Sequence, residues 1–192
     1  MTKVPIYLIL LGCAPLALAA AGAQQTSDVP AWHQAQETNE AAAYTYTRFT
    51  LAGKYMAGYN ASAGRPALMI DCMPRSDSYI SSRAYLGANL RAGSPLKIIY
   101  VEPEEAHGMA YFPEVAVQYA ANDDRHMERD AWLSGADKTT VSVPRRALMR
   151  FLQARSVSIL AKDDHGTQFA MQFDMPDPTV VTTSCKLNME FR

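Results

Sequence analysis

Short runs of strand-forming residues, separated by turn formers, fill most of this 192-residue chain. In the run 44–51, β-branched and aromatic residues alternate with others, as they do in a half-buried strand. Similar runs cover 54–59, 66–73, 78–86, 96–101, 115–121, 125–133, 139–143, 156–162 and 167–173. Short strands at such close intervals predict a mainly β fold, either an antiparallel β-sandwich or a barrel-like domain.

One segment departs from this pattern and predicts a short amphipathic helix over 144–154. Pro144 suits the first helical position, because proline lacks the N–H that a helix start leaves unbonded. The apolar residues of the segment fall on one helical stripe: Ala147, Leu148, Phe151, Leu152 and Ala154. The opposite side carries Arg145, Arg146 and Arg150. We expect this helix to lie across an edge or an open end of the sheets.

The first 23 residues have the features of a secretory signal peptide. A basic start at Lys3 is followed by an apolar run over 4–18 and by small-residue cleavage sites near 19–23. We therefore predict a protein of the periplasm or a secreted protein. Residues 24–43 are expected to form a flexible lead-in, and 44–192 a single β-rich domain. No later apolar run is long enough for a transmembrane span.

Whether the cysteines form a disulfide depends on that export. Cys72 and Cys185 remain after leader removal, and in an oxidising compartment we expect them to pair as a disulfide. The third cysteine, Cys13, ends a Leu-Leu-Gly-Cys sequence that resembles a lipobox, so a membrane-anchored lipoprotein is the alternative localisation. We favour Cys13 as an ordinary residue of the apolar leader, because an apolar stretch follows it where an anchored protein usually has a polar tether.

Composition and motifs exclude several classes of function. The net charge is -1, from 18 Lys and Arg against 19 Asp and Glu, so the chain lacks the excess of positive charge that binds nucleic acid. The chain has no G-x-S-x-G or S-x-x-K nucleophile motif and no phosphate-binding loop. Its four histidines lack metal-ligand spacing. We therefore predict no catalytic residues, no cofactor and no metal site.

The surface residues that we consider for binding are tyrosines and arginines. Tyr44 and Tyr46 share one face of a predicted strand and suit contact with sugar or protein, although β-sheets favour tyrosine in any case. Arg145, Arg146 and Arg150 could meet phosphate or carboxylate groups of an envelope polymer, or could simply be a solvated helix face.

The order of these segments resembles that of secreted β-sandwich proteins of the VasI/TagO type, which accompany bacterial type VI secretion systems. The matching segments are 66–72, 117–123, Trp132-Leu-Ser134 with Asp137, 148–154, 157–159, Phe169 and Cys185. The chain has Phe173-Asp-Met-Pro176 where this pattern has a glycine. The resemblance implies a β-sandwich closed by a disulfide in the bacterial envelope, and a role beside a secretion system.

The sequence thus predicts a non-enzymatic exported envelope protein that binds, or is accessory to, an unidentified envelope protein or polymer. The alternative is a metal-dependent or carboxylate hydrolase acting on cell-wall material. That alternative would use the acidic and histidine cluster at 123–130, which includes His126, Glu128 and Asp130. A solvated strand face, with the acids paired to Arg125 and Arg129, explains the same cluster without any chemistry.

Overall fold

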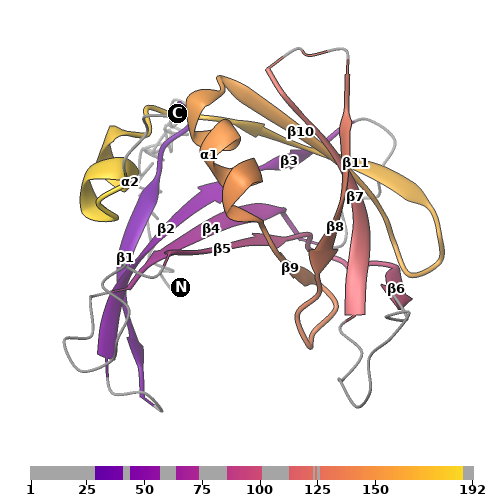
Figure 1. The fold of residues 1–192 in the computed structure, drawn as a ribbon, viewed down its shortest axis with the longest axis horizontal. Helices are drawn as coiled ribbons and strands as arrows, with labels where there is room; N and C mark the ends of the chain where they lie inside the picture. The colour runs from indigo at the N-terminus through magenta and orange to yellow at the C-terminus, as the bar shows by residue number, and fades with distance from the viewer. Residues whose placement is uncertain are drawn as a thin grey trace, which may run out of the picture.

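The computed structural model describes residues 29–40, 44–56, 64–73, 86–100, 113–122, 124 and 126–187. The strands are β1 (His33–Asn39), β2 (Tyr44–Ala52), β3 (Lys54–Tyr55), β4 (Ala67–Cys72), β5 (Leu86–Arg91), β6 (Ile98–Tyr100), β7 (Pro113–Ala121), β8 (Glu128–Leu133), β9 (Thr140–Ser142), β10 (Ser156–Lys162) and β11 (Gln168–Asp174). The helices are α1 (Arg145–Gln153) and α2 (Thr179–Ser184). The mainly β fold predicted from the spacing of the runs is confirmed, with two antiparallel sheets (Figure 1).

The first sheet has the strand order β1-β2-β4-β5-β9, with antiparallel pairing throughout. Its inner face is apolar because alternate side chains point the same way along a strand. Phe49, Leu51, Leu68, Ile70 and Leu90 lie on that face, and each is at most 1% exposed. This sheet therefore supplies one wall of the core.

The second sheet has the order β3-β11-β10-β7-β6, and β8 pairs with β7. Strands β10 and β11, which coincide closely with the predicted runs 156–162 and 167–173, pair as an antiparallel hairpin. Its register runs from Ser156 opposite Asp174 to Lys162 opposite Gln168. Gly166 in the connecting turn has a φ of 87°, a conformation that glycine adopts without strain.

The two sheets join at both sides into a curled, barrel-like shell. On one side the chain passes directly from β2 to β3 at Gly53. A Cβ at this position would lie 2.6 Å from the ring of the buried Phe173, so the crossing point has room only for glycine. On the other side, an isolated bridge between Ser134 and Val141 links the end of β8 to β9.

Helix α1 lies between the two sheets and completes the core (Figure 1). Phe151 packs with Tyr119 and Trp132, at ring-centroid distances of 5.4 and 6.3 Å, and all three are at most 1% exposed. Burial of an aromatic side chain of this size stabilises the fold by roughly 2–3 kcal/mol. The predicted amphipathic helix is thus confirmed, with Leu148 and Leu152 on the buried stripe.

The predicted disulfide is present and ties the C-terminal part of the chain to the first sheet. Cys72 at the end of β4 and Cys185 after α2 are 113 positions apart in sequence, and their Cα atoms are 4.9 Å apart. Val181 of α2 and Cys185 are both buried against the core. The sequence predicts the disulfide but not the helix α2 that precedes Cys185.

One expectation about the N-terminal region is wrong. Residues 33–39, expected to belong to the flexible lead-in over 24–43, form β1, which pairs with β2 from His33 opposite Thr50 to Asn39 opposite Tyr44. The run at 78–86 lies almost entirely outside the described residues, as do the leader 1–23 and Cys13. Within the described part, no helix is both long and apolar enough to cross a membrane.

Candidate functional site

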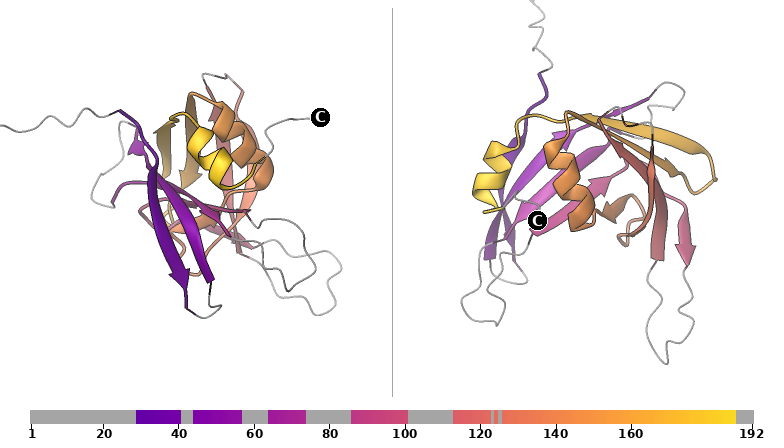
Figure 2. Two further views of the ribbon diagram at one scale, coloured as in Figure 1. Left: turned by 90° about the vertical axis from the view of Figure 1, so that its left-hand side faces the viewer. Right: turned by 45° about the horizontal axis from the view of Figure 1, so that its top comes forward.

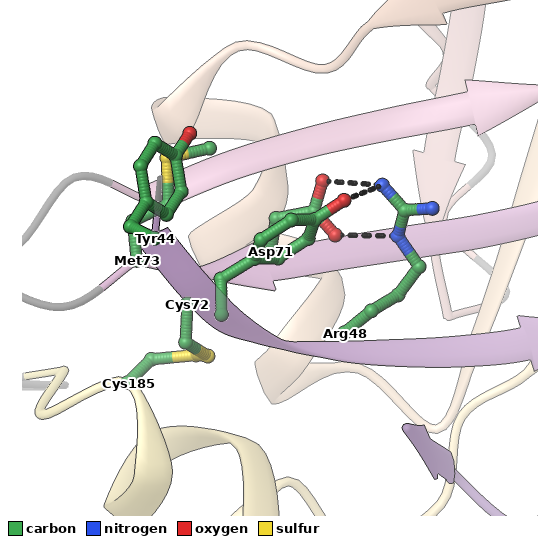
Figure 3. Close-up of polar contacts among 7 residues, drawn as sticks. Tyr44, Arg48, Asp71, Cys72, Met73 and Cys185 are labelled. Carbon is green, nitrogen blue, oxygen red and sulfur yellow. Dashed lines mark hydrogen bonds and ion pairs between the residues drawn. A yellow bond between two sulfur atoms is a disulfide. The ribbon is translucent and has the colours of Figure 1, made fainter. Parts of the chain in front are cut away.

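Strand β2 carries a polar and aromatic face that points away from the core. Phe49 and Leu51 point into the core, so the period of two places Tyr44, Tyr46 and Arg48 on the opposite face. The predicted sharing of one strand face by Tyr44 and Tyr46 is therefore found. Asp71 joins them from β4, because it stands directly opposite Arg48 in the register. We call these four residues the Tyr–Arg surface (Figure 3).

The centre of the Tyr–Arg surface is a bidentate ion pair. Arg48 Nε donates to Asp71 Oδ1 at 2.7 Å, and Arg48 Nη2 donates to Asp71 Oδ2 at 2.9 Å. Asp71 is only 5% exposed, whereas the Arg48 side chain is 28% exposed. The hydrogen bond to Asp71 outweighs desolvation, and with the charge of that carboxylate it raises the pKa of Arg48 above its ordinary value. The guanidinium is therefore a fixed positive charge.

Tyr46 is held against this pair, and Tyr44 packs beside Tyr46. Arg48 Nη2 also donates to the Tyr46 hydroxyl at 3.0 Å, and the guanidinium carbon lies 5.3 Å from the centroid of the Tyr46 ring. The rings of Tyr44 and Tyr46 are 6.0 Å apart and tilted by 57°. The Tyr44 hydroxyl donates to Met73 Sδ at 3.3 Å. The surface thus offers ring edges and a cation that are already positioned.

The disulfide lies directly behind the Tyr–Arg surface. Asp71 and Cys72 are consecutive in β4, so their side chains leave opposite faces of the sheet. Figure 3 shows Cys72 directed to Cys185 on one side, and Asp71 directed to Arg48 on the other. The covalent link therefore restrains the strand end that carries the carboxylate.

The α1 arginines form a separate cluster, because their helix lies between the sheets. Glu128 of β8 accepts a hydrogen bond from the Tyr119 hydroxyl at 2.7 Å, and it forms ion pairs with Arg150 and with Arg146 at 3.7 Å. Arg145 is exposed. The predicted basic surface is thus partly neutralised by one carboxylate and does not join Tyr44 and Tyr46.

The described members of the acidic and histidine cluster do not converge on one point. Glu128, expected to pair with Arg125 or Arg129 on a solvated strand face, pairs instead with Arg146 and Arg150 of α1. Asp130 accepts hydrogen bonds from the Ala131 N–H at 2.9 Å and the Trp132 indole N–H at 3.2 Å. Residues 123 and 125 lie outside the described part, and among the residues that are described no three His, Cys, Asp or Glu side chains gather as metal ligands.

A shallow groove of about 550 Å³ opens near the C-terminal end of α1. It is lined by residues of three segments: 152–155 at the end of α1, 175–178 before α2, and Thr179 and Thr182 of α2. This groove is open to solvent, and its lining mixes polar and apolar residues without a cluster of charged or aromatic side chains. The Tyr–Arg surface is therefore the stronger candidate.

Arg48 and Asp71 are the residues of this surface that sequence reasoning does not predict. The signal for Arg48 is its spacing, since it continues the 44, 46, 48 alternation. Asp71 is recognisable only from the pairing of β2 with β4. No family model, curated protein or solved structure matches the chain.

Proposed function

We propose that this protein is a non-enzymatic, exported binding or accessory module of the bacterial envelope, and that it contacts a partner through the Tyr–Arg surface. The observation that supports this most directly is the Tyr46–Arg48–Asp71 network, which lies on the sheet face opposite the core. Tyrosine and arginine contribute most of the binding energy at many protein interfaces. Side chains already fixed in one conformation lose little entropy on binding.

The geometry of the rings favours a protein partner over a flat stack of sugar rings. The Tyr46 ring already has a guanidinium over it, and the Tyr44 ring is tilted by 57° relative to the Tyr46 ring. A sugar platform needs open, roughly coplanar ring faces, whereas tilted rings with polar neighbours suit irregular protein side chains. We therefore place a protein of the envelope first among the partners.

Export of the chain is supported by the leader pattern of residues 1–23 and by the Cys72–Cys185 disulfide, since such bonds persist in oxidising compartments. The resemblance to VasI/TagO-type proteins adds a specific setting, beside a type VI secretion system. In that setting the domain presents a surface and performs no chemistry.

Site-specific photocrosslinking tests this proposal. The full chain, with its own leader, carries a photoreactive residue at position 46, or at the control position 168, which is exposed on the second sheet. We expect a discrete adduct with an envelope protein from position 46 only. The intact mass of the recovered chain would also distinguish cleavage near residue 23 from acylation at Cys13. Equal adducts from both positions, or none from position 46, would refute the proposed surface.

A further inference from the structure

Strand β1 is the edge strand of the first sheet among the residues that the structure describes. No described strand other than β2 pairs with it, and the pairing with β2 is an unbroken register of seven residues (Figure 2, left). Natural edge strands usually carry charged side chains (above all lysine), proline or a bulge that blocks pairing with another chain. The sequence of β1, His-Gln-Ala-Gln-Glu-Thr-Asn, contains no lysine or proline, and its register contains no bulge.

We infer that β1 pairs antiparallel with β1 of a second copy of this chain, centred on Gln36. In that register Gln36 faces Gln36 of the second copy, and Gln34 faces Thr38. The single carboxylate of the strand, Glu37, faces the small Ala35 and never its own copy. The strand is therefore self-complementary, since polar amides meet at the centre and like charges stay apart.

Charge complementarity favours this occupant. Ala35 stands directly opposite Arg48 of β2 on the outer face of the sheet. In the dimer, Ala35 would lie between Arg48 of one copy and Glu37 of the other. Its short side chain leaves room for that glutamate to lean towards Arg48, which stays bonded to Asp71 on the other side of β2. Arg48 bonds Asp71 and Tyr46 through Nε and Nη2, so its Nη1 is not used in these bonds. The carboxylate from the second copy would therefore lie on the same outer face as this partly exposed cation, two strands away, rather than beside another carboxylate.

The dimer would place two Tyr–Arg surfaces on one face of a continuous sheet. An antiparallel pair related by a two-fold axis perpendicular to the sheet keeps both outer faces on the same side. If the proposed function holds, the paired surfaces would engage a repeated partner with higher avidity than one surface alone. Dimer formation itself does not depend on that function.

Sedimentation velocity over a range of concentrations tests the inference with the full chain, purified under non-reducing conditions. We expect the wild type to be dimeric at about 100 µM, a concentration at which a micromolar dimer is nearly fully assembled. Ala35→Glu puts a carboxylate opposite Glu37 at two symmetric positions. We expect it to weaken the dimer by about tenfold. The monomer should tolerate the change, because the new carboxylate also faces Arg48.

Gln34→Glu is the matched control, because it adds the same charge to the same strand but opposite Thr38. We expect this variant to dimerise as the wild type does, and thermal melts of both variants should show that each is folded. A wild type that remains monomeric would overturn the inference, and so would equal dimer affinities for Ala35→Glu and Gln34→Glu. Crosslinking from position 46 is unaffected by either result, so the two proposals can fail separately.

Discussion

Replacement of Asp71 by asparagine tests how strongly the Tyr–Arg surface is held. The introduced amide is isosteric with the native carboxylate, but the change removes the charge and turns one acceptor into a donor that faces Arg48. Breaking a fully buried ion pair by losing one partner costs about 3–5 kcal/mol. Arg48 is 28% exposed, so water can solvate the released guanidinium, and we expect a smaller loss of about 2–3 kcal/mol. For a domain of this size, the melting temperature should fall by about 4–12 °C.

Thermal unfolding followed by circular dichroism, with the disulfide intact, measures this loss. The control is Asp174→Asn, which breaks the Lys54–Asp174 pair, whose side chains are 58% and 47% exposed. Exposed pairs contribute less than about 1 kcal/mol, so the control should melt close to the wild type. The double variant Arg48→Met with Asp71→Leu should be more stable than Asp71→Asn alone, because no charge is left without its partner. An Asp71→Asn loss no larger than that of the control would refute this reasoning.

Two further predictions concern the disulfide and the turn before β9. Reduction of the Cys72–Cys185 bond should lower the urea midpoint of unfolding, because a link between residues 113 positions apart contributes up to about 4–5 kcal/mol by loop entropy. Reductant should not change the midpoint of the Cys72→Ser, Cys185→Ser double variant. An unchanged wild-type midpoint would contradict the prediction. Desolvation raises the pKa of Asp137, but hydrogen bonds from Thr139 and Thr140 outweigh it and hold this pKa below the ordinary value of 3.8. The contribution of ionised Asp137 to the free energy of unfolding is therefore complete above pH 3.8 and is lost as the pH falls through the lower folded-state pKa. Urea unfolding at several pH values should show the wild type losing its stability advantage over Asp137→Asn below pH 3.8. A difference in unfolding free energy that does not change with pH would contradict this.

The strands that face the core could be predicted from the sequence, because burial of one face imposes a period of two. The run at 156–162 coincides with β10, and the run at 167–173 differs from β11 by one residue at each end. β1 could not be found in this way, since its seven residues include only one apolar side chain, Ala35. Its position is determined by backbone hydrogen bonds to β2 rather than by a hydrophobic face.

The candidate site was only partly predictable for a similar reason. Tyr44 and Tyr46 could be placed on one face by alternation alone. Which arginines and carboxylates meet depends on the pairing of distant segments. Glu128 joins α1 because the helix packs against β7 and β8, and Asp71 meets Arg48 because β4 pairs with β2. Sequence periodicity contains neither relationship.

The position of the Arg48–Asp71 pair bears on whether it serves stability or binding. A buried ion pair stabilises a fold no more than well-packed apolar side chains of similar volume, and often less. The inner face of the same sheet already has its apolar core, and the Cys72–Cys185 bond secures the strand end. If the pair serves binding, the Arg48→Met and Asp71→Leu double variant should keep most of the stability but lose the adduct from position 46. If the pair serves stability alone, the same variant should keep the adduct, so the two roles are separable by experiment.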